Sequence, residues 1–196
     1  VHSVAISSDG EYIVVGSDDT KVYLFDKDSS TPLWSYETDG NVYDVDISAD
    51  GEYIVVGTGN DHKVYLFGKD NSMPLWNYTS THGAVHTVAI SADGEYIVTG
   101  TSKVHLFDKD SGTPLRSYTT ELGVLSVAIS SDGEYIAAGS LDDRVYFFDR
   151  YSSTPVWRYD TGDTVNSVAI SANGEYIVAG SFDDKVYLFD KDNSTP

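Results

Sequence analysis

The chain of 196 residues contains no cysteine, a single methionine, five prolines and few basic residues. Without cysteine it can form no disulfide, use no thiol nucleophile and build no cysteine-ligated metal site, although this absence does not define its compartment. Twelve Lys and Arg residues stand against 31 Asp and Glu, which gives a formal charge of −19. A surface of that charge repels phosphate backbones and anionic lipid headgroups. The composition therefore argues against nucleic-acid and membrane-surface partners.

Long apolar runs are missing as well. No stretch approaches the roughly 18 consecutive apolar residues that a membrane-spanning helix needs. Residues 1–7 have the pattern of a strand and not of a signal peptide, so we predict no membrane insertion. Two sequons, at Asn77 and Asn193, would accept N-glycans in an exported protein. They favour an extracellular or cell-surface location only weakly, and the compartment stays open.

One short motif recurs along the whole chain. Asp-Gly-Glu-Tyr-Ile begins at Asp9, Asp50, Asp93 and Asp132, and Asn-Gly-Glu-Tyr-Ile begins at Asn173. A period of about 40 residues is typical of repeat folds in which each repeat forms one structural unit. The sequence therefore predicts one module present in five copies.

The complete repeat contains four short β-rich runs. In the first copy they cover residues 4–6, 12–15, 22–25 and 33–36, with glycine or polar turns between them. Val, Ile, Tyr and Phe are frequent, and no apolar spacing of three and four residues indicates a helix. The first three runs are apolar at consecutive positions, which means that both faces of each small sheet are covered. We predict an all-β protein, a β-propeller of four-stranded antiparallel blades in a single domain.

The copies define the predicted blades. They cover residues 1–41, 42–84, 85–123, 124–164 and 165–196. The fifth copy stops before its fourth, outer strand. We expect a ring of five blades, completed by a strand that precedes the first copy or comes from another molecule, because ring closure removes free sheet edges. With further repeats the ring would have six to eight blades.

Two family resemblances follow from these motifs. Residues 1–26 resemble a blade of the WD-repeat type, with Phe25 in place of the tryptophan of the Trp-Asp pair. In residues 26–34, Asp26 precedes a serine by three residues and Trp34 by eight, which is similar to the tryptophan-docking motif of quinoprotein-like, or PQQ-like, propellers. The motif is incomplete in the third copy, where Arg116 replaces the tryptophan. Both resemblances imply a propeller, and neither implies a particular function, because propellers carry many functions.

Catalytic motifs are absent from the chain: there is no Gly-x-Ser-x-Gly elbow, no phosphate-binding loop and no His-Glu-x-x-His. The quinoprotein resemblance implies an oxidation by a bound quinone and calcium, and five-bladed glycosidases would use carboxylates in the channel. Almost every acidic residue recurs in most copies, however, and no acidic cluster stands out. We therefore predict no enzyme activity, no catalytic residue and no cofactor.

Metal binding is not predicted either. His82 and His86 are four residues apart, a spacing that converges on a metal only within a helix. His105 replaces a tyrosine of the other copies and is interpreted as a packed strand residue. The acidic turns, such as residues 108–112, fit turn chemistry, with calcium binding as the alternative.

Positions that differ between the copies are candidates for binding. These are the second residue of each copy, the turns between the second and third strands, and the connections between blades. We expect them to gather around one mouth of the central channel. The candidate binding residues are His2, Tyr43, His62, His86, Leu122, Leu125, Leu141, Asn166 and Phe182.

The sequence thus predicts a non-catalytic propeller that serves protein interaction or structural assembly. Its partner would be another protein, or a second copy bound through one propeller face or through the incomplete fifth blade. The alternative is a lectin-like binder with several near-equivalent carbohydrate sites between the blades. A quinoprotein-like or glycosidase-type enzyme is the third hypothesis.

Overall fold

The computed structural model describes all 196 residues and consists of 19 β-strands in five antiparallel sheets. Four sheets have four strands, and the fifth, β17–β18–β19, has three. In every sheet the strands lie side by side in chain order. This confirms the predicted all-β fold of four-stranded blades with an outer strand missing from the last. Since every regular element is a strand, there is no membrane-spanning helix.

Each blade runs from an innermost to an outermost strand. Blade 1 contains β1 (Ser3–Ile6), β2 (Tyr12–Gly16), β3 (Lys21–Asp26) and β4 (Trp34–Glu37). Blade 2 contains β5 (Val42–Ile47), β6 (Tyr53–Thr58), β7 (Lys63–Gly68) and β8 (Pro74–Thr79). Blade 3 contains β9 (Thr87–Ile90), β10 (Tyr96–Gly100), β11 (Lys103–Asp108) and β12 (Arg116–Thr119). Blade 4 contains β13 (Val124–Ile129), β14 (Tyr135–Ser140), β15 (Arg144–Asp149) and β16 (Trp157–Asp160). Blade 5 contains β17 (Val165–Ile170), β18 (Tyr176–Ser181) and β19 (Lys185–Asp190).

The repeated Asp-Gly motif forms the turn between the first two strands of each blade. In blade 1, Asp9 Oδ1 accepts hydrogen bonds from the Ser7 hydroxyl at 2.6 Å and from the Glu11 N–H at 3.0 Å. Gly10 has the left-handed φ of 74° that the turn requires. The carboxylate thus stabilises the turn on which the next strand depends, and Asp50, Asp93 and Asp132 make the same bonds.

The core lies between the blades. Val14 and Leu24 of blade 1 form one buried cluster with Val45, Ile54 and Phe67 of blade 2. Equivalent clusters join each later blade to its neighbour. This explains the consecutive apolar residues in the sequence, because alternate side chains of one strand contact different neighbouring blades.

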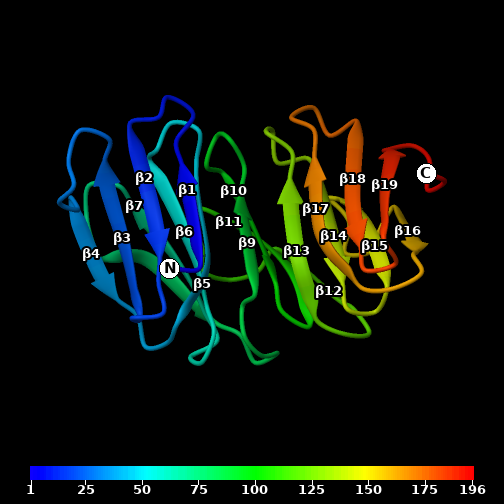
Figure 1. The fold of residues 1–196 in the computed structure, drawn as a ribbon, viewed down its shortest axis with the longest axis horizontal. Helices are drawn as coiled ribbons and strands as arrows, with labels where there is room; N and C mark the ends of the chain where they lie inside the picture. The colour runs from blue at the N-terminus through cyan, green and yellow to red at the C-terminus, as the bar shows by residue number, and fades with distance from the viewer.

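The five blades form an open arc. Innermost strands are packed in series, β1 on β5, β5 on β9, β9 on β13 and β13 on β17, and Figure 1 shows blades 1 and 5 at opposite ends. Val4 and Ile6 are 63% and 61% exposed, whereas their equivalents in blade 2, Val45 and Ile47, are 4% and 7% exposed. The expected closed ring of five blades is therefore wrong. The packing between neighbouring blades sets their angle, and at this angle five blades do not complete a circle.

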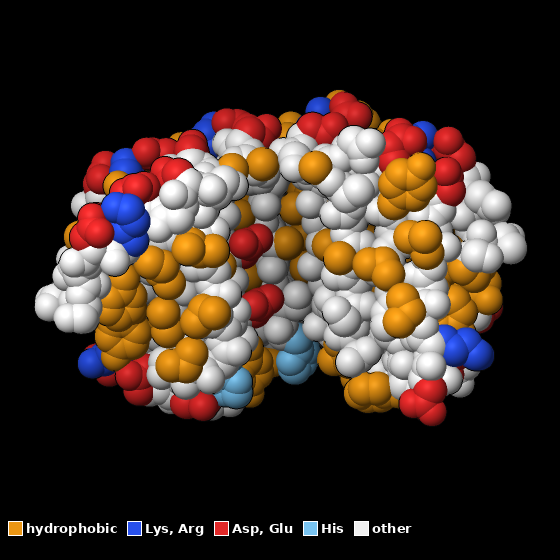
Figure 2. Space-filling view, turned by 45° about the horizontal axis from the view of Figure 1, so that its top comes forward, with side chains coloured by type: hydrophobic (Ala, Val, Ile, Leu, Met, Phe, Trp, Pro, Cys, Tyr) orange, Lys and Arg blue, Asp and Glu red, His pale blue; other side chains and the backbone are white.

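The loops form two rims. The Lys27 N–H donates to the Glu11 carbonyl at 2.9 Å, so the β3–β4 loop lies beside the β1–β2 turn. The Thr38 N–H donates to the Thr20 carbonyl at 2.8 Å, so the connection between blades lies beside the β2–β3 turn. We call the rim of repeated Asp-Gly turns the constant rim and the opposite one, with the connections between blades, the variable rim. Figure 2 shows acidic side chains along the upper edge of the molecule, where the constant rim lies.

Candidate functional site

Three candidate residues form a row of rings at the variable rim. His2, Tyr43 and His86 precede or begin the innermost strands of blades 1, 2 and 3. The Tyr43 ring lies 5.7 Å from His2, edge to face, and 5.9 Å from His86, with planes 13° apart. His2 Nε2 is 2.6 Å from Asp18 Oδ1. Partial burial lowers the pKa of His86, which favours its neutral form in the stack.

Three apolar candidates protrude from the loops of the same rim. Leu122, Leu141 and Phe182 are all exposed. The Leu141 N–H donates to the Gly123 carbonyl at 2.8 Å, and the Phe182 N–H donates to the Thr164 carbonyl at 2.9 Å. Each of these two turns is thus hydrogen-bonded to the connection beside it, and the side chains of Leu141 and Phe182 are exposed to solvent.

The other candidates contribute less to this surface. Leu125 is half-buried and Asn166 is exposed, both on the innermost strands of their blades. His62 has a left-handed φ of 57° in the β6–β7 turn, and its N–H donates to the Gly59 carbonyl at 3.1 Å. No ring contact joins it to the row. The same left-handed position is taken by Thr20, Asp143 and Asp184 in other blades, so His62 has a structural place in its turn.

Two carboxylates on β5 contradict the expectation that no acidic cluster stands out. Asp44 Oδ1 accepts from the Ser3 hydroxyl at 2.7 Å, and its Oδ2 accepts from the Val88 N–H at 2.9 Å. Asp46 Oδ2 accepts from the Ile90 N–H at 2.9 Å. The pair therefore links blade 2 to both neighbours. At the equivalents of Asp44 the other copies have Ser3, Thr87, Ser126 and Ser167, and at the equivalents of Asp46 they have Ala5, Ala89, Ala128 and Ala169.

The electrostatics of this pair are unusual. Burial raises the pKa of Asp44, and burial together with the charge of Asp44 raises the pKa of Asp46 to about 6. Figure 2 shows acidic side chains inside the hollow of the arc. Comparing the Asp-Val-Asp-Ile of this copy with the Ser-Val-Ala-Ile or Thr-Val-Ala-Ile of the other copies would have revealed the pair. Since backbone N–H groups engage both carboxylates, their visible role is to hold blades together.

Blade 3 differs at its third strand. Tyr65 and Tyr146 donate their hydroxyls to turn carboxylates at 3.0 and 2.8 Å, whereas blade 3 has a shorter turn and His105 at the tyrosine position. His105 is buried, its Nδ1 lies 2.8 Å from Ser117 Oγ, and its Nε2 has no partner. Burial lowers its pKa to about 4. The interpretation of His105 as a packed strand residue is confirmed. No group of three or more His, Asp or Glu side chains could hold a metal ion.

One comparison with known proteins identifies a relationship. A family model described as outer membrane protein assembly factor BamB matches residues 2–195. Of the two family resemblances that the motifs indicated, the match supports the PQQ-like one. No curated protein matches the chain.

Proposed function

Because the chain belongs to the PQQ-like propeller family whose model is described as outer membrane protein assembly factor BamB, we propose that it is a non-catalytic scaffold that binds another protein. That description names a role exercised on proteins. The observation that carries the proposal is the variable rim, where exposed Leu122, Leu141 and Phe182 accompany the rings of Tyr43 and His86. Apolar and aromatic groups exposed among polar ones are typical of protein-binding surfaces.

The charge of the variable rim indicates the chemistry of the partner. A partner surface with an apolar centre and basic surroundings would match it, and opposite charges would speed the encounter. Exposed acidic residues border the apolar groups: Asp18, Asp19, Asp39, Glu121, Asp143, Asp163 and Asp184.

Exchanging the variable residues for those of other copies is expected to weaken partner binding at least tenfold. Tyr43→Asn and His86→Asn introduce the residue found at Asn166, and Phe182→Asp introduces the residue found at Asp18, so each variant carries a residue that another copy of the repeat has at the equivalent position. The lost aromatic contacts are of the kind that dominates interfaces. The partner would be isolated with the unaltered chain as bait, purified, and titrated against both chains by calorimetry.

The matched control for this exchange lies on the constant rim. Asp28→Asn changes one exposed charge, as Phe182→Asp does, without touching the variable rim, and binding is expected to be unchanged. Equal affinity of the variable-rim variant and the unaltered chain would contradict the proposal. One glycan bound at several sites per chain on a glycan array would favour the carbohydrate-binding alternative instead.

The open ends of the arc favour self-assembly as a second candidate. Within the chain, Val22 and Leu24 of one blade are buried in one cluster with Val45 of the next. At the ends, the equivalents on the open face of blade 5 are Val186 and Leu188, which are exposed, as are Val4 and Ile6 on blade 1. The first blade of a second copy therefore presents the apolar face that the fifth blade lacks.

Polar groups at the two ends are complementary in the same way. The Val168 N–H donates to Ser126 Oγ at 3.1 Å across the junction of blades 4 and 5. Ser167 and Val4 are the corresponding acceptor and donor at the open ends. Tyr176 is exposed on blade 5, and the space beside Gly10 is open, whereas every other such glycine lies under a tyrosine of the preceding blade. Such head-to-tail contacts form rings when the rotation closes and filaments when it does not.

We expect the unaltered chain to sediment as multiples of its 21.4 kDa mass in analytical ultracentrifugation. Val186→Lys with Leu188→Lys buries charge in the contact and should give the monomer. Leu33→Lys, which changes another exposed apolar residue on the edge of blade 1, should leave assembly intact. A monomer that persists for the unaltered chain at millimolar concentration would contradict self-assembly.

A further inference from the structure

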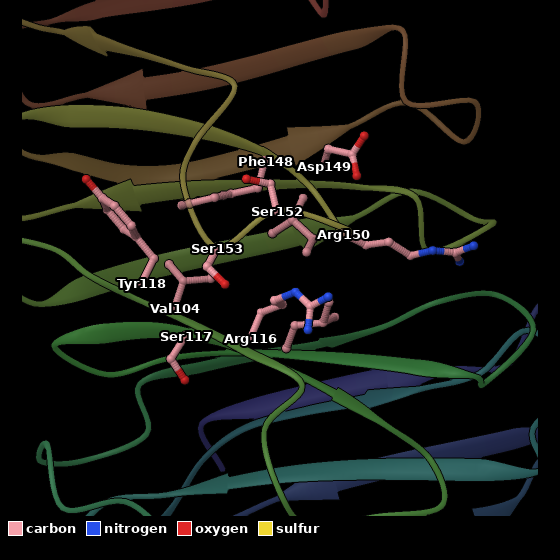
Figure 3. A pocket seen from close by; sticks show the side chains of 11 residues that line it. Val104, Arg116, Ser117, Tyr118, Phe148, Asp149, Arg150, Ser152 and Ser153 are labelled. Atoms are coloured by element: carbon pink, nitrogen blue, oxygen red, sulfur yellow. The ribbon is translucent and has the colours of Figure 1, made fainter.

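Three departures from the repeat meet at the junction of blades 3 and 4. Arg116 stands where blades 1, 2 and 4 have Trp34, Trp76 and Trp157. Arg150 and Tyr151 stand where the other four copies have a lysine followed by an aspartate. Arg116 and Arg150 line two adjoining hollows on the outer side of this junction, and Tyr151 lines the second of them. The first is seen in Figure 3. Three changes at one place mark this junction as specialised.

The tryptophans show what this position holds elsewhere. Trp34 Nε1 donates to the Lys69 carbonyl of the next blade at 2.6 Å, and its ring lies 5.5 Å from Phe67. Trp76 and Trp157 donate to the next blade in the same way, each at 2.8 Å. The indole therefore seals the outer junction through one hydrogen bond and one ring contact.

Arg116 does not reproduce this arrangement. Its side chain is exposed, and Nη1 donates to the carbonyl of the adjacent Leu115 at 2.7 Å. With Arg116 in place, the hollow over Val104 and Phe148 has a volume of about 20 Å³, which is room for about one water molecule. Phe148 is the equivalent of Phe67, and the Arg150 carbonyl, the equivalent of the acceptor at Lys69, receives no hydrogen bond from the protein. Figure 3 shows Arg150 extending to the right above Arg116, with Ser153 to the left of both.

The hollow also carries unpaired positive charge. Neither Arg116 nor Arg150 has a carboxylate within ion-pair distance, although the chain is strongly acidic. The Arg150 guanidinium lies 4.5 Å from the centre of the Tyr96 ring and 4.7 Å from that of Tyr151. Asp149 lines the hollow too, but its carboxylate accepts the Tyr151 N–H at 2.7 Å. By contrast, the lysines at this position in blades 1, 2 and 3 form ion pairs: Lys27 with Glu11, Lys69 with Glu52 and Lys109 with Glu95.

We propose that this junction binds a tryptophan side chain of a partner polypeptide, with a neighbouring carboxylate of that partner held by Arg116 and Arg150. Arg116 is exposed and turns outward as the indole enters. The ring packs on Phe148, and its N–H donates to the Arg150 carbonyl, as the chain's own tryptophans do at three other junctions. Guanidinium groups bind carboxylates in a planar, two-bond geometry, which suits the second half of the ligand.

The proposal rests on the scaffold function only in that the ligand belongs to a polypeptide. Small probes test the junction without any partner protein. N-acetyl-tryptophan carries both the indole and the carboxylate, its primary amide lacks the charge, and N-acetyl-alanine lacks the ring. We expect N-acetyl-tryptophan to shift the NMR signals of blades 3 and 4, and to bind at least threefold more tightly than its amide and tenfold more tightly than N-acetyl-alanine.

Arg116→Trp is the decisive variant because it places the repeat's own residue in the hollow and should fold at least as well as the unaltered chain. It is expected to lower the affinity for N-acetyl-tryptophan at least tenfold. Arg158→Ser, on the neighbouring strand β16, is the matched control and should bind normally. Undiminished binding by Arg116→Trp would overturn the proposal, as would equal binding of N-acetyl-alanine or the absence of shifts at saturating probe. These results would leave the variable-rim proposal untouched.

Discussion

Gly133→Ala is expected to destabilise the protein by about 2–5 kcal/mol, whereas Gly10→Ala should cost only about 1–2 kcal/mol. Both glycines occupy the same turn with nearly the same left-handed φ, 69° and 74°. A methyl on Gly133 would lie 2.4 Å from Tyr96 Cδ2 of the preceding blade, while at Gly10 the nearest atom is 4.0 Å away. The difference between the two variants therefore isolates the contact between blades from the strain of the turn.

Urea unfolding followed by circular dichroism measures both values. It is performed at a concentration where the chain is monomeric, because an assembled partner would cover Gly10. Gly51→Ala and Gly94→Ala, which also lie under tyrosines, should behave like Gly133→Ala. Equal costs at Gly10 and Gly133 would show that the tyrosine contact does not contribute to stability.

Asp46→Ala is expected to become more stable relative to the unaltered chain as the pH rises. The difference between their free energies of unfolding should increase by about 3 kcal/mol from about pH 3.5 to about pH 7. The pKa of Asp46 is raised from 3.8 to about 6 in the folded protein. A raised acid stabilises the fold below its unfolded pKa, and this stability is lost as the pH rises through the folded value. The variant has no carboxylate at this position and loses nothing in that window.

Losing the acceptor for the Ile90 N–H opposes this gain by about 1 kcal/mol at every pH, so the change with pH is the quantity to measure. Asp183→Asn is the control of opposite sign. The hydrogen bond from Tyr187 lowers the pKa of Asp183, so that variant should be less stable near neutral pH, and the difference should shrink on acidification. A stability difference for Asp46→Ala that does not vary with pH would contradict the raised pKa.

Much of the fold was predictable because the chain repeats. The spacing of the Asp-Gly-Glu-Tyr-Ile motif, the strand pattern and the missing outer strand all agree with the five sheets. The repeat also allowed the variable positions to be picked out, and the structure brings His2, Tyr43 and His86 into contact. The comparison of copies contained a signal for Asp44 and Asp46, but their role depends on hydrogen bonds to the next blade, which the sequence does not show.

Features that depend on contacts between blades could not be predicted from local sequence patterns. Replacement of a tryptophan by Arg116 was visible, but its coincidence in space with Arg150 and Tyr151 was not, because these residues come from different blades. The closed ring failed for a similar reason. The number of repeats can be read from the sequence. The angle between blades cannot, because it depends on how whole layers of side chains interdigitate.

The sequence by itself determined the units of this protein: strands of Val, Ile, Tyr and Phe, turns held by an aspartate and a left-handed glycine, and five copies in a row. These depend on interactions within a few residues, which a repeat states several times over. Only the tertiary structure decided that the arc is open, that two carboxylates join blades across β5, and that one junction lacks its indole. Each of these depends on contacts between residues about 35–45 positions apart, for example Trp34 with Lys69 and Asp46 with Ile90, and such contacts exist only once the blades are packed.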